Sequence, residues 1–389
     1  MLRLKSHFSC FLNAAPGRLH AAAHSHHLWP DVTRAAQSAA WEQAAVLADD
    51  KWSTIFGEVV PQAQRHIARI LNVGDPNAIV FAPNTHDLVR RLFSCLPATS
   101  APRVLTTDSE FHSFTRQAAR LEEEGALEVE RISTEPFDTF EDRFAEAASR
   151  GGHDLIFFSQ VFFNSGFAIG DLERMVKAAP DPATLVAIDG YHGFMAMPTD
   201  ISALSSRAFY IAGGYKYAMA GEGACFMACP PGYGARPRDT GWYADFFALS
   251  QRQSGVGYAS DAMRFMGATF DPVGLYRLNA VMGWLQGLGV SVADIHAHAH
   301  ALQGLFVEGL RTRSVAALDP GLLMVPLDEP RRGNFLTFRT DRAAELHRIL
   351  SEARVVTDVR GDRLRVGFGL YHEARDIDLL LDAVAAALA

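Results

Sequence analysis

The sequence predicts an α/β protein: a mostly parallel sheet covered by helices, followed by a smaller α+β part. Short apolar runs alternate with longer amphipathic stretches as far as about Phe270, and this alternation is typical of a parallel sheet with helices on both faces. Beyond that residue, long helical stretches and a few short strands take over. A chain of 389 residues also commonly divides its core between two domains.

The apolar runs predict buried strands, because each is too short for a typical helix and most are rich in Val, Ile and Phe. These strands are expected at residues 78–82, 104–107, 155–159, 184–188, 208–212 and 224–228. Apolar residues at helical spacing predict helices between them, at residues 87–96, 114–123, 140–148 and 171–178.

The remaining segments complete the domain organisation. In the C-terminal part, the sequence pattern predicts helices at residues 272–288, 293–310, 342–352 and 374–388. It predicts strands at 322–326, 334–338 and 364–368. Two N-terminal helices, at 30–47 and 52–71, are expected to pack between the two parts. We therefore expect an N-terminal segment over residues 1–50 that packs on both domains, a large domain over 51–272 and a small domain over 273–389.

Composition and charge exclude several classes of protein. The chain is 49% hydrophobic and 21% charged, with a formal net charge of −8, which is ordinary globular composition. Without a strong basic patch, nucleic acid is not an expected partner. No apolar stretch reaches the roughly 18 residues that a transmembrane helix needs, so no membrane partner is expected. His7, Ser9 and Asn13 interrupt the apolar N-terminus, which predicts no signal peptide.

The cysteines favour a reducing compartment. Only four occur, Cys10, Cys95, Cys225 and Cys229, which is too few for a disulfide framework. Cys225 and Cys229 lie in one predicted strand, where they would be about 13 Å apart and unable to form a bridge. We therefore expect a cytoplasmic protein.

Two polar residues end neighbouring apolar strands and carry the first indication of chemistry. Asp189 follows Leu185-Val-Ala-Ile, and Lys216 follows Phe209-Tyr-Ile-Ala-Gly-Gly-Tyr. The carboxyl ends of such strands meet at one edge of the sheet, where active sites lie. A Lys and an acid there suit pyridoxal 5′-phosphate (PLP): the Lys forms the Schiff base, and the carboxylate pairs with the protonated pyridine nitrogen. The alternative is a buried ion pair or two solvated loop residues.

The motifs around these residues resemble those of a known family. Asp189-Gly-Tyr-His192, followed downstream by Gly213-Gly-Tyr-Lys216-Tyr, resembles the class V aminotransferase family of PLP enzymes, and the chain looks most like its kynureninase branch. The resemblance extends from Phe11-Leu-Asn to Arg365-Val-Gly-Phe-Gly-Leu-Tyr371. It implies PLP-dependent transferase fold type I, with a mostly parallel seven-stranded sheet, a smaller α+β C-terminal domain, and a homodimer with shared active sites.

The resemblance also implies roles for single residues. Lys216, Asp189 and His192 would be catalytic. Thr85, Ser113 and Tyr215 would hold the cofactor phosphate, with Asn84 beside Thr85 at the start of a helix, which offers N–H groups to an anion. An ordinary helix cap is compatible with that role. Phe111, with His112 as the alternative, would cover the pyridine ring, and His192 would lie near it.

Other matches concern the subunit interface and the substrate. Trp242 and Thr269 resemble elements that reach the cofactor across the dimer. Arg365 would take the α-carboxylate of a small amino-acid substrate through two parallel hydrogen bonds. Ser25 aligns with an N-terminal element that touches substrate.

Departures from the kynureninase pattern guide the functional prediction. Phe163 stands where kynureninases have a Tyr, and His112-Ser-Phe114 replaces Pro-Ser-Asp. We therefore predict an aminotransferase-type reaction. The alternatives are a kynureninase-like hydrolase that cleaves a Cβ–Cγ bond and releases alanine, and a catalytically silent PLP-fold binding protein. A cysteine desulfurase is disfavoured because no Cys follows Cys229.

The histidines raise the question of a metal site. His296 and His300 are four residues apart, the spacing that puts two imidazoles on one helix face. No cluster of carboxylates or cysteines completes a ligand set. We therefore predict no metal and a solvated helix face at His296–His300.

Overall fold

The central element of the protein is a seven-stranded sheet. The computed structural model describes residues 1–98, 101–248, 250 and 254–389. The strand order is β2-β8-β7-β6-β5-β3-β4. The strands are β2 (Ile79–Ala82), β3 (Arg103–Thr107), β4 (Glu128–Ile132), β5 (Leu155–Ser159), β6 (Leu185–Asp189), β7 (Phe209–Gly213) and β8 (Cys225–Ala228). Only the pairings of β8 with β2 and β7 are antiparallel, so the expected mostly parallel seven-stranded sheet is confirmed.

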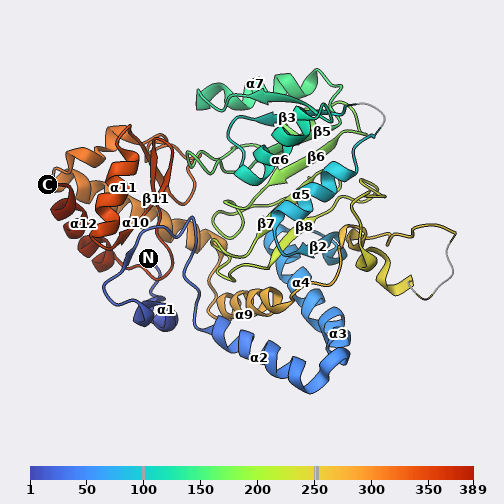
Figure 1. The fold of residues 1–389 in the computed structure, drawn as a ribbon. Coiled ribbons are helices and arrows are strands. Elements are labelled where there is room, and N and C mark those ends of the chain that lie inside the picture. The colour runs from blue at the N-terminus through green and yellow to red at the C-terminus, as the bar shows by residue number, and fades with distance from the viewer. Residues whose placement is uncertain (99–100, 249, 251–253) are drawn as a thin grey trace.

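Helices cover both faces of this sheet (Figure 1). The alternation of side chains along β5 divides the core, because Ile156 and Phe158 point to one face and Leu155 and Phe157 to the other. The first face packs against α4 (Val60–Leu71), α7 (Phe137–Ser149), α8 (Leu172–Lys177) and α9 (Val273–Gly287). The second face packs against α5 (Thr85–Ser94) and α6 (His112–Glu123).

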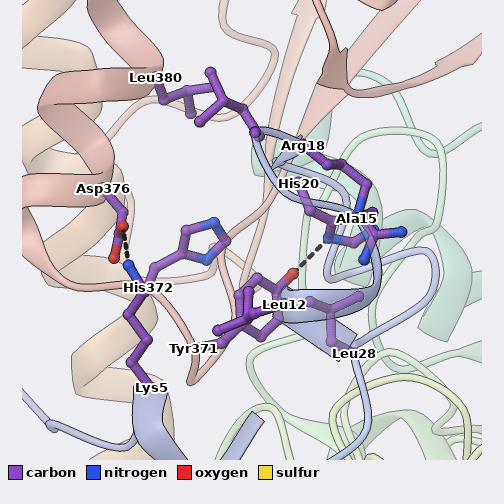
Figure 2. Close-up of a pocket in the computed structure, with 12 residues that line it drawn as sticks. Lys5, Leu12, Ala15, Arg18, His20, Leu28, Tyr371, His372, Asp376 and Leu380 are labelled. Atoms are coloured by element: carbon purple, nitrogen blue, oxygen red, sulfur yellow. Dashed lines mark hydrogen bonds and ion pairs between the residues drawn. The ribbon is translucent and has the colours of Figure 1, made fainter. Parts of the chain in front are cut away.

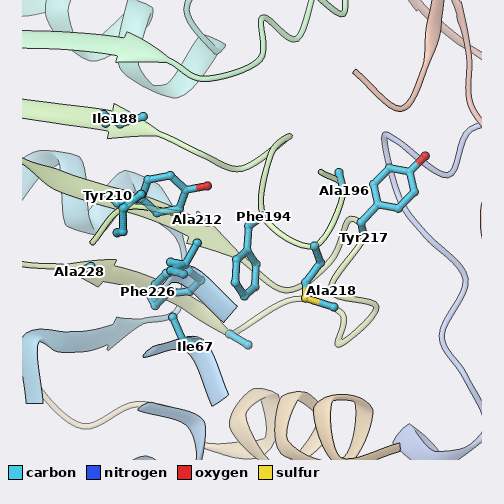
Figure 3. Packing of buried hydrophobic residues seen from close by; sticks show 14 of the residues in the cluster. Ile67, Ile188, Phe194, Ala196, Tyr210, Ala212, Tyr217, Ala218, Phe226 and Ala228 are labelled. Atoms are coloured by element: carbon cyan, nitrogen blue, oxygen red, sulfur yellow. The ribbon is translucent and has the colours of Figure 1, made fainter. Parts of the chain in front are cut away.

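The first of these faces forms a continuous apolar layer beneath the strand ends. Figure 3 shows Tyr210 and Ala212 of β7 and Phe226 of β8 beside Phe194, with Ile67 of α4 nearby. Phe194 and Phe226 meet edge to face, with ring centroids 4.8 Å apart. This buried layer gives the loops that follow β6 and β7 a rigid base.

A second sheet belongs to the smaller C-terminal part. It is antiparallel, in the order β11-β12-β9. Its strands are β9 (Leu336–Arg339), β11 (Asp358–Arg360) and β12 (Arg363–Val366), and its helices are α10 (Val292–Thr312), α11 (Ala343–Glu352) and α12 (Ala374–Leu388). These elements share a separate apolar cluster. The division into domains at residues 50 and 272 stays a prediction.

The N-terminal segment runs back along both parts. After α1 (Ser9–Ala14), β1 (Leu19–His20) pairs in parallel with β10 (Val355–Val356) of the C-terminal part. In Figure 1 the two chain ends lie on that same part. Helix α2 (Val32–Leu47) then packs along α9, and α3 (Lys51–Thr54) leads through a π-helical turn (Ile55–Val59) into α4.

Two expectations about local structure were wrong. Residues 322–326 form no strand: the Asp319 side chain caps a 3-10 turn at Pro320–Leu322, and Leu323 makes only an isolated bridge to Phe338. Strand β4 was missed because it is an edge strand whose charged residues interrupt the apolar run. Within the described residues, no helix is long and apolar enough to cross a bilayer.

Candidate active site

Lys216 lies just beyond the carboxyl end of β7 and is the centre of the candidate site. The residue is 5% exposed. Its Nζ lies 4.6 Å from the ring centroid of Tyr191, 5.6 Å from that of Phe111 and 5.7 Å from that of Tyr215. Across residues 1–98, 101–248, 250 and 254–389, no carboxylate comes within ion-pair distance of this amine. The amine is therefore enclosed by aromatic rings and not neutralised by a salt bridge.

Burial changes the acidity of Lys216. It lowers the pKa of the ammonium to about 7, while the charge of Asp189 opposes this change. About half of such amines are free of their proton at pH 7. A free amine is what nucleophilic attack on a carbonyl requires.

Asp189 ends β6, next to the strand that leads to Lys216. Its Oδ1 accepts a hydrogen bond of 2.9 Å from the backbone N–H of Tyr191, which fixes the carboxylate at the start of the loop. Burial raises the pKa of Asp189, and that amide and the charge of Lys216 counteract the rise. Ser159 and Ile211 pair with Asp189 in register, so the three strands end at one edge as predicted.

Glu110 is a buried acid at the same edge that the sequence did not reveal. Its carboxylate accepts hydrogen bonds from Thr107 Oγ1 at 2.7 Å, Ser159 N at 3.1 Å and Ser159 Oγ at 2.5 Å. Burial raises the pKa of Glu110 to about 8. The hydrogen bonds tie the loop after β3 to the end of β5. Phe111, which follows Glu110, is thereby held beside Lys216.

Two helix N-termini supply the candidate phosphate site. Asn84 caps α5, with its side-chain oxygen accepting a hydrogen bond of 2.9 Å from Asp87 N, and Thr85 is the first helical residue. Phe111 occupies the N-cap position of α6, and Ser113 lies in the first turn. Free N–H groups and hydroxyls at such positions suit an anion. The Asn84 side chain is engaged at both its oxygen and its Nδ2, which donates to Asp87 Oδ2 at 3.4 Å, and this leaves Thr85 the better candidate.

Tyr215 and the N-terminal histidines form the next layer. The ring of Tyr215 stacks on His26 with centroids 4.9 Å apart and lies 4.7 Å from the ring of Tyr191. Burial raises the pKa of the Tyr215 hydroxyl, so it stays a donor. Ser25, by contrast, has its hydroxyl 3.4 Å from His26 Nδ1 on the exposed side. The buried members of that run are His24 and His27.

His24 and His192 flank the ring of Phe335. His24 stacks on Phe335 with centroids 4.6 Å apart and an angle of 18°, and His192 lies 5.2 Å from the same ring. His24 is fully buried, and neither of its ring nitrogens has a hydrogen-bond partner among the described residues. Burial lowers the pKa of both imidazoles, and neighbouring cations lower it further. Both rings are therefore neutral.

Arg365 lies on β12 and reaches the site from the C-terminal part. The residue is 2% exposed, and its guanidinium lies between the rings of Phe163 and Phe335, at 5.8 Å and 5.6 Å from their centroids. It pairs with Asp358, which faces it directly across the β11–β12 hairpin, and donates to the carbonyl of Phe163. Burial lowers the pKa of Arg365 to about 10, so it remains a cation.

Trp242 and Thr269 lie at the surface. Trp242 is 45% exposed, and its ring packs on Tyr243 with centroids 4.2 Å apart. Thr269 is exposed and lines a cavity of about 320 Å³ beside Pro83, which precedes α5. Both side chains are exposed, and Thr269 lies near the start of α5, the helix of the candidate phosphate site. A second subunit in a homodimer would have access to this surface. Contact with a partner's cofactor stays a prediction.

The expected solvated face of α10 is not observed. His298 is buried, and His296 and His300 are half-buried, with ring centroids 4.0 Å apart. His296 Nδ1 lies 2.7 Å from Asn334 Oδ1, and His300 Nδ1 lies 3.2 Å from a guanidinium nitrogen of Arg332. The prediction was wrong because the segment before β9 packs polar groups against this helix, which the helical spacing alone does not reveal.

A separate cavity of about 230 Å³ lies between the N-terminal segment and α12 (Figure 2). Its lining does not include Lys216. His20 Nδ1 lies 2.5 Å from the Tyr371 hydroxyl, and Lys5 pairs with Asp376. Because these polar groups satisfy one another, we place the candidate active site at Lys216 and not in this cavity.

The donor set at Lys216 fits PLP. An amine with a pKa near 7 can form the imine, a buried carboxylate lies on the neighbouring strand, and Phe111 offers a ring close to the amine. Two helix N-termini are available for the phosphate. Bound PLP supplies an electron sink for a carbanion formed at the substrate's Cα.

Three site residues were missed by sequence reasoning. His24 stands in the motif His24-Ser-His-His, where Ser25 was chosen because it aligned with a family element. Asp358 could have been found from the hairpin Asp358-Val-Arg-Gly-Asp-Arg-Leu-Arg365, because a tight turn at Gly361 places the two charges opposite each other. Glu110 carries no local signal that identifies it, since Ser159, which donates two of its three hydrogen bonds, is forty-nine residues away.

Comparison with known proteins places these findings in a family. The model of the family described as "Aminotransferase class-V" matches residues 27–380. An uncharacterized aminotransferase of Bacillus subtilis strain 168, YcbU, is 21% identical over 341 residues, covering 83% of this chain and 82% of the relative. The apo structure of a cysteine desulfurase from Thermococcus onnurineus NA1 has a TM-score of 0.76 at 15% identity, covering 100% of this chain and 99% of the other.

A second solved structure is the cystine C–S lyase C-DES in complex with its product, cysteine persulfide. Its TM-score is 0.76 at 16% identity, covering 96% of this chain and 99% of the other. These structures share the fold of this chain, which confirms the predicted fold type I, and the family match makes PLP the cofactor. The kynureninase branch, the homodimer and the cytoplasmic location stay predictions. Since the family match spans nearly the whole chain, the protein belongs to the class-V aminotransferase family of PLP-dependent enzymes.

Proposed function

We propose that the protein transfers the amino group of an α-amino acid to a 2-oxo acid. One observation carries the proposal: a buried amine, Lys216, lies at the strand end beside Asp189 and belongs to the same buried polar cluster as a second cation, Arg365. The first cation is free to lose its proton, and the second is not. An α-amino acid needs these two functions, proton removal at Cα and a grip on its carboxylate.

Lys216 has the leading role in this reaction. With a pKa of about 7 it would hold the cofactor covalently and, when released by substrate, could accept the proton from the substrate's Cα. Asp189 would hold the proton on the pyridine nitrogen of bound PLP through a charge-assisted hydrogen bond. The Tyr191 amide orients that carboxylate at 2.9 Å. Phe111, Tyr191 and Tyr215 exclude water from the amine.

Arg365 binds the substrate's α-carboxylate. Its planar guanidinium can form two parallel hydrogen bonds with a carboxylate, and its aromatic neighbours keep it in a fixed orientation. Apart from its partner Asp358, the groups around it are Phe163, Phe335 and the neutral His24, and these favour an uncharged substrate side chain.

Phe163 favours transfer over Cβ–Cγ hydrolysis. Its ring lies 5.5 Å from that of Phe111 and 5.0 Å from that of His112, and it brings no hydroxyl to this part of the site. Hydrolysis of a Cβ–Cγ bond needs a further proton donor near the side chain. Amino transfer needs no such additional donor, because Lys216 would act as both the base and the acid for the single proton that leaves the substrate's Cα.

A second candidate is elimination at a carbon–sulfur bond, favoured by the likeness to C-DES and to the cysteine desulfurase. It also begins with proton removal at Cα. No cysteine follows Cys229, and burial raises the pKa of the Cys225 thiol to about 11, so that thiol is a poor acceptor of sulfur. A lyase of this kind would therefore release its sulfur product instead of carrying it on its own cysteine.

The test is a single-turnover experiment with the PLP-loaded protein and a panel of L-amino acids. Amino transfer predicts that the yellow imine band disappears without an oxo acid and returns when a 2-oxo acid is added. If cystine or cysteine instead gives pyruvate while the band persists, the lyase replaces the transferase. Alanine released from kynurenine without an oxo acid would contradict both the transferase and the lyase, and would support the hydrolase.

A further inference from the structure

The carboxylate-binding arginine already has a carboxylate. Asp358 Oδ2 pairs with one terminal nitrogen of Arg365, and the other terminal nitrogen donates to the carbonyl of Phe163. Asp358 is 8% exposed, and its second oxygen accepts a 2.6 Å hydrogen bond from Arg360. Both terminal nitrogens of the guanidinium are therefore engaged, while its Nε has no hydrogen-bond partner among the described residues. A substrate carboxylate can form parallel bonds with both terminal nitrogens only if Asp358 gives way.

A second polar group faces the same oxygen of Asp358. His24 Nε2 lies 4.0 Å from Asp358 Oδ2, beyond hydrogen-bond range but within ion-pair range. Neither ring nitrogen of His24 has a partner among the described residues, although the side chain is completely buried. A buried imidazole without partners is costly unless a partner is available in another state.

The protein holds this imidazole firmly in place. His24 stacks on Phe335, and its other side lies against Gly367, where a Cβ atom would come within 2.5 Å of Nδ1. Backbone hydrogen bonds of 3.1 Å and 2.8 Å join Ala23 and Ala21 to Gly367. The glycine thus makes room for the ring, and the ring remains beside Asp358.

We propose that Asp358 is a resident carboxylate which the substrate's carboxylate displaces from Arg365, and that the freed Asp358 turns to His24. The proposal deepens the proposed function, on which it rests only in assigning Arg365 as the carboxylate site. It makes Asp358 and His24 positioning residues, and it sets a threshold for binding: amino acids must compete with an internal carboxylate.

Charge balance gives His24 its part. Arg360 still balances one oxygen of the displaced Asp358, but Asp358 Oδ2 loses the guanidinium of Arg365 as its partner, a loss that is unfavourable in a buried site. A proton on His24 compensates it. The other groups that face His24 are Arg365 and Arg360 of the hairpin, Lys216 after β7, His192 after β6 and His20 on its own segment. Burial first, and then the cations among them, keep His24 neutral at rest, so carboxylate binding is expected to take up a proton.

The test uses the PLP-loaded protein and propionate, a carboxylate without an amine, so that binding is measured without turnover. Calorimetric titrations in two buffers of different ionisation enthalpy give both affinity and proton uptake. For the wild type we expect proton uptake on binding. Asp358→Asn is expected to bind propionate at least tenfold more tightly, without proton uptake. Asp362→Asn, an exposed acid in the same hairpin, is the matched control and should match the wild type.

Further variants separate this idea from a structural role for Asp358. His24→Phe should weaken propionate binding severalfold and abolish proton uptake, while Arg365→Lys should weaken binding in every background. If Asp358→Asn binds propionate no better than the wild type, Asp358 only holds Arg365 in place and the proposal fails. Wild-type binding without proton uptake overturns it equally, even if a variant does not fold. Because propionate is not turned over, the propionate titrations can still be interpreted if the protein transfers the amino group of no amino acid.

Discussion

Lys216 and Arg365 are two buried cations of one site, and the protein treats them in opposite ways. Lys216 is surrounded by the rings of Phe111, Tyr191 and Tyr215, and no carboxylate lies within ion-pair distance in the described part of the chain. Arg365 is paired with Asp358 and has rings at its faces. Burial lowers the pKa of both groups, to about 7 for the amine and about 10 for the guanidinium.

The difference shows how surroundings assign a task to each charge. An unpaired lysine near its pKa can exchange a proton, which suits a nucleophile and a base. A paired arginine keeps its proton at any physiological pH and acts only by its charge and its fork of donors. The same site therefore holds one cation that reacts and one that binds.

The largest expected effect comes from removing the reactive cation. Lys216→Ala should abolish the imine band and lower kcat by at least about 10³-fold, because nucleophile and base are lost together. Visible spectra and steady-state rates check this, and Lys177→Ala, at an exposed lysine that ends α8, serves as the control. A variant that kept a normal imine band would show that another amine holds the cofactor.

Replacing the binding cation should have a smaller and different effect. Arg365→Lys keeps the charge but loses the fork, so kcat/KM for an α-amino acid should fall about 100-fold, or roughly 3 kcal/mol, mainly through KM. Amines without a carboxylate should react as with the wild type. An equal loss for amino acids and amines would mean that Arg365 supports the fold instead of gripping the substrate.

The sequence predicted the reactive cation better than the binding one. Lys216 and Asp189 could be located because each ends an apolar strand, and parallel strands bring their carboxyl ends together whatever their spacing in the chain. Arg365 was assigned through a family resemblance alone. Its engagement with Asp358 depends on the hairpin register, which the strand prediction at 364–368 did not include.

Interactions between distant segments were the part that could not be predicted. Glu110 is held by Ser159, forty-nine residues away, and His24 packs on Phe335 from another part of the fold. Such pairs leave no periodicity in the sequence. The misjudged face of α10 has the same origin, because Arg332 and Asn334 approach it from the segment before β9.

The pKa of Lys216 can be measured through cofactor loading. Only the free amine forms the imine, so the rate at which the apoprotein takes up PLP should rise with pH and level off above about pH 8, as expected for a group with a pKa of about 7. Stopped-flow absorbance across the pH range measures this. A rate still rising steeply at pH 9 would mean that Lys216 has an ordinary pKa and that the contrast with Arg365 is weaker than described.

The smallest expected effect concerns the buried acid at the same edge. Burial raises the pKa of Glu110 from 4.5 to about 8, so the folded protein binds this proton more tightly than the unfolded chain does. The stabilisation is complete below the unfolded pKa and is lost as the pH rises through about 8. Glu110→Gln removes this dependence. Its Tm should fall less than that of the wild type between pH 5 and 9, by a few degrees, which scanning calorimetry can resolve. Parallel Tm curves would mean that the donors from Ser159 and Thr107 keep Glu110 ionised, so that this edge of the sheet carries two negative charges beside Lys216.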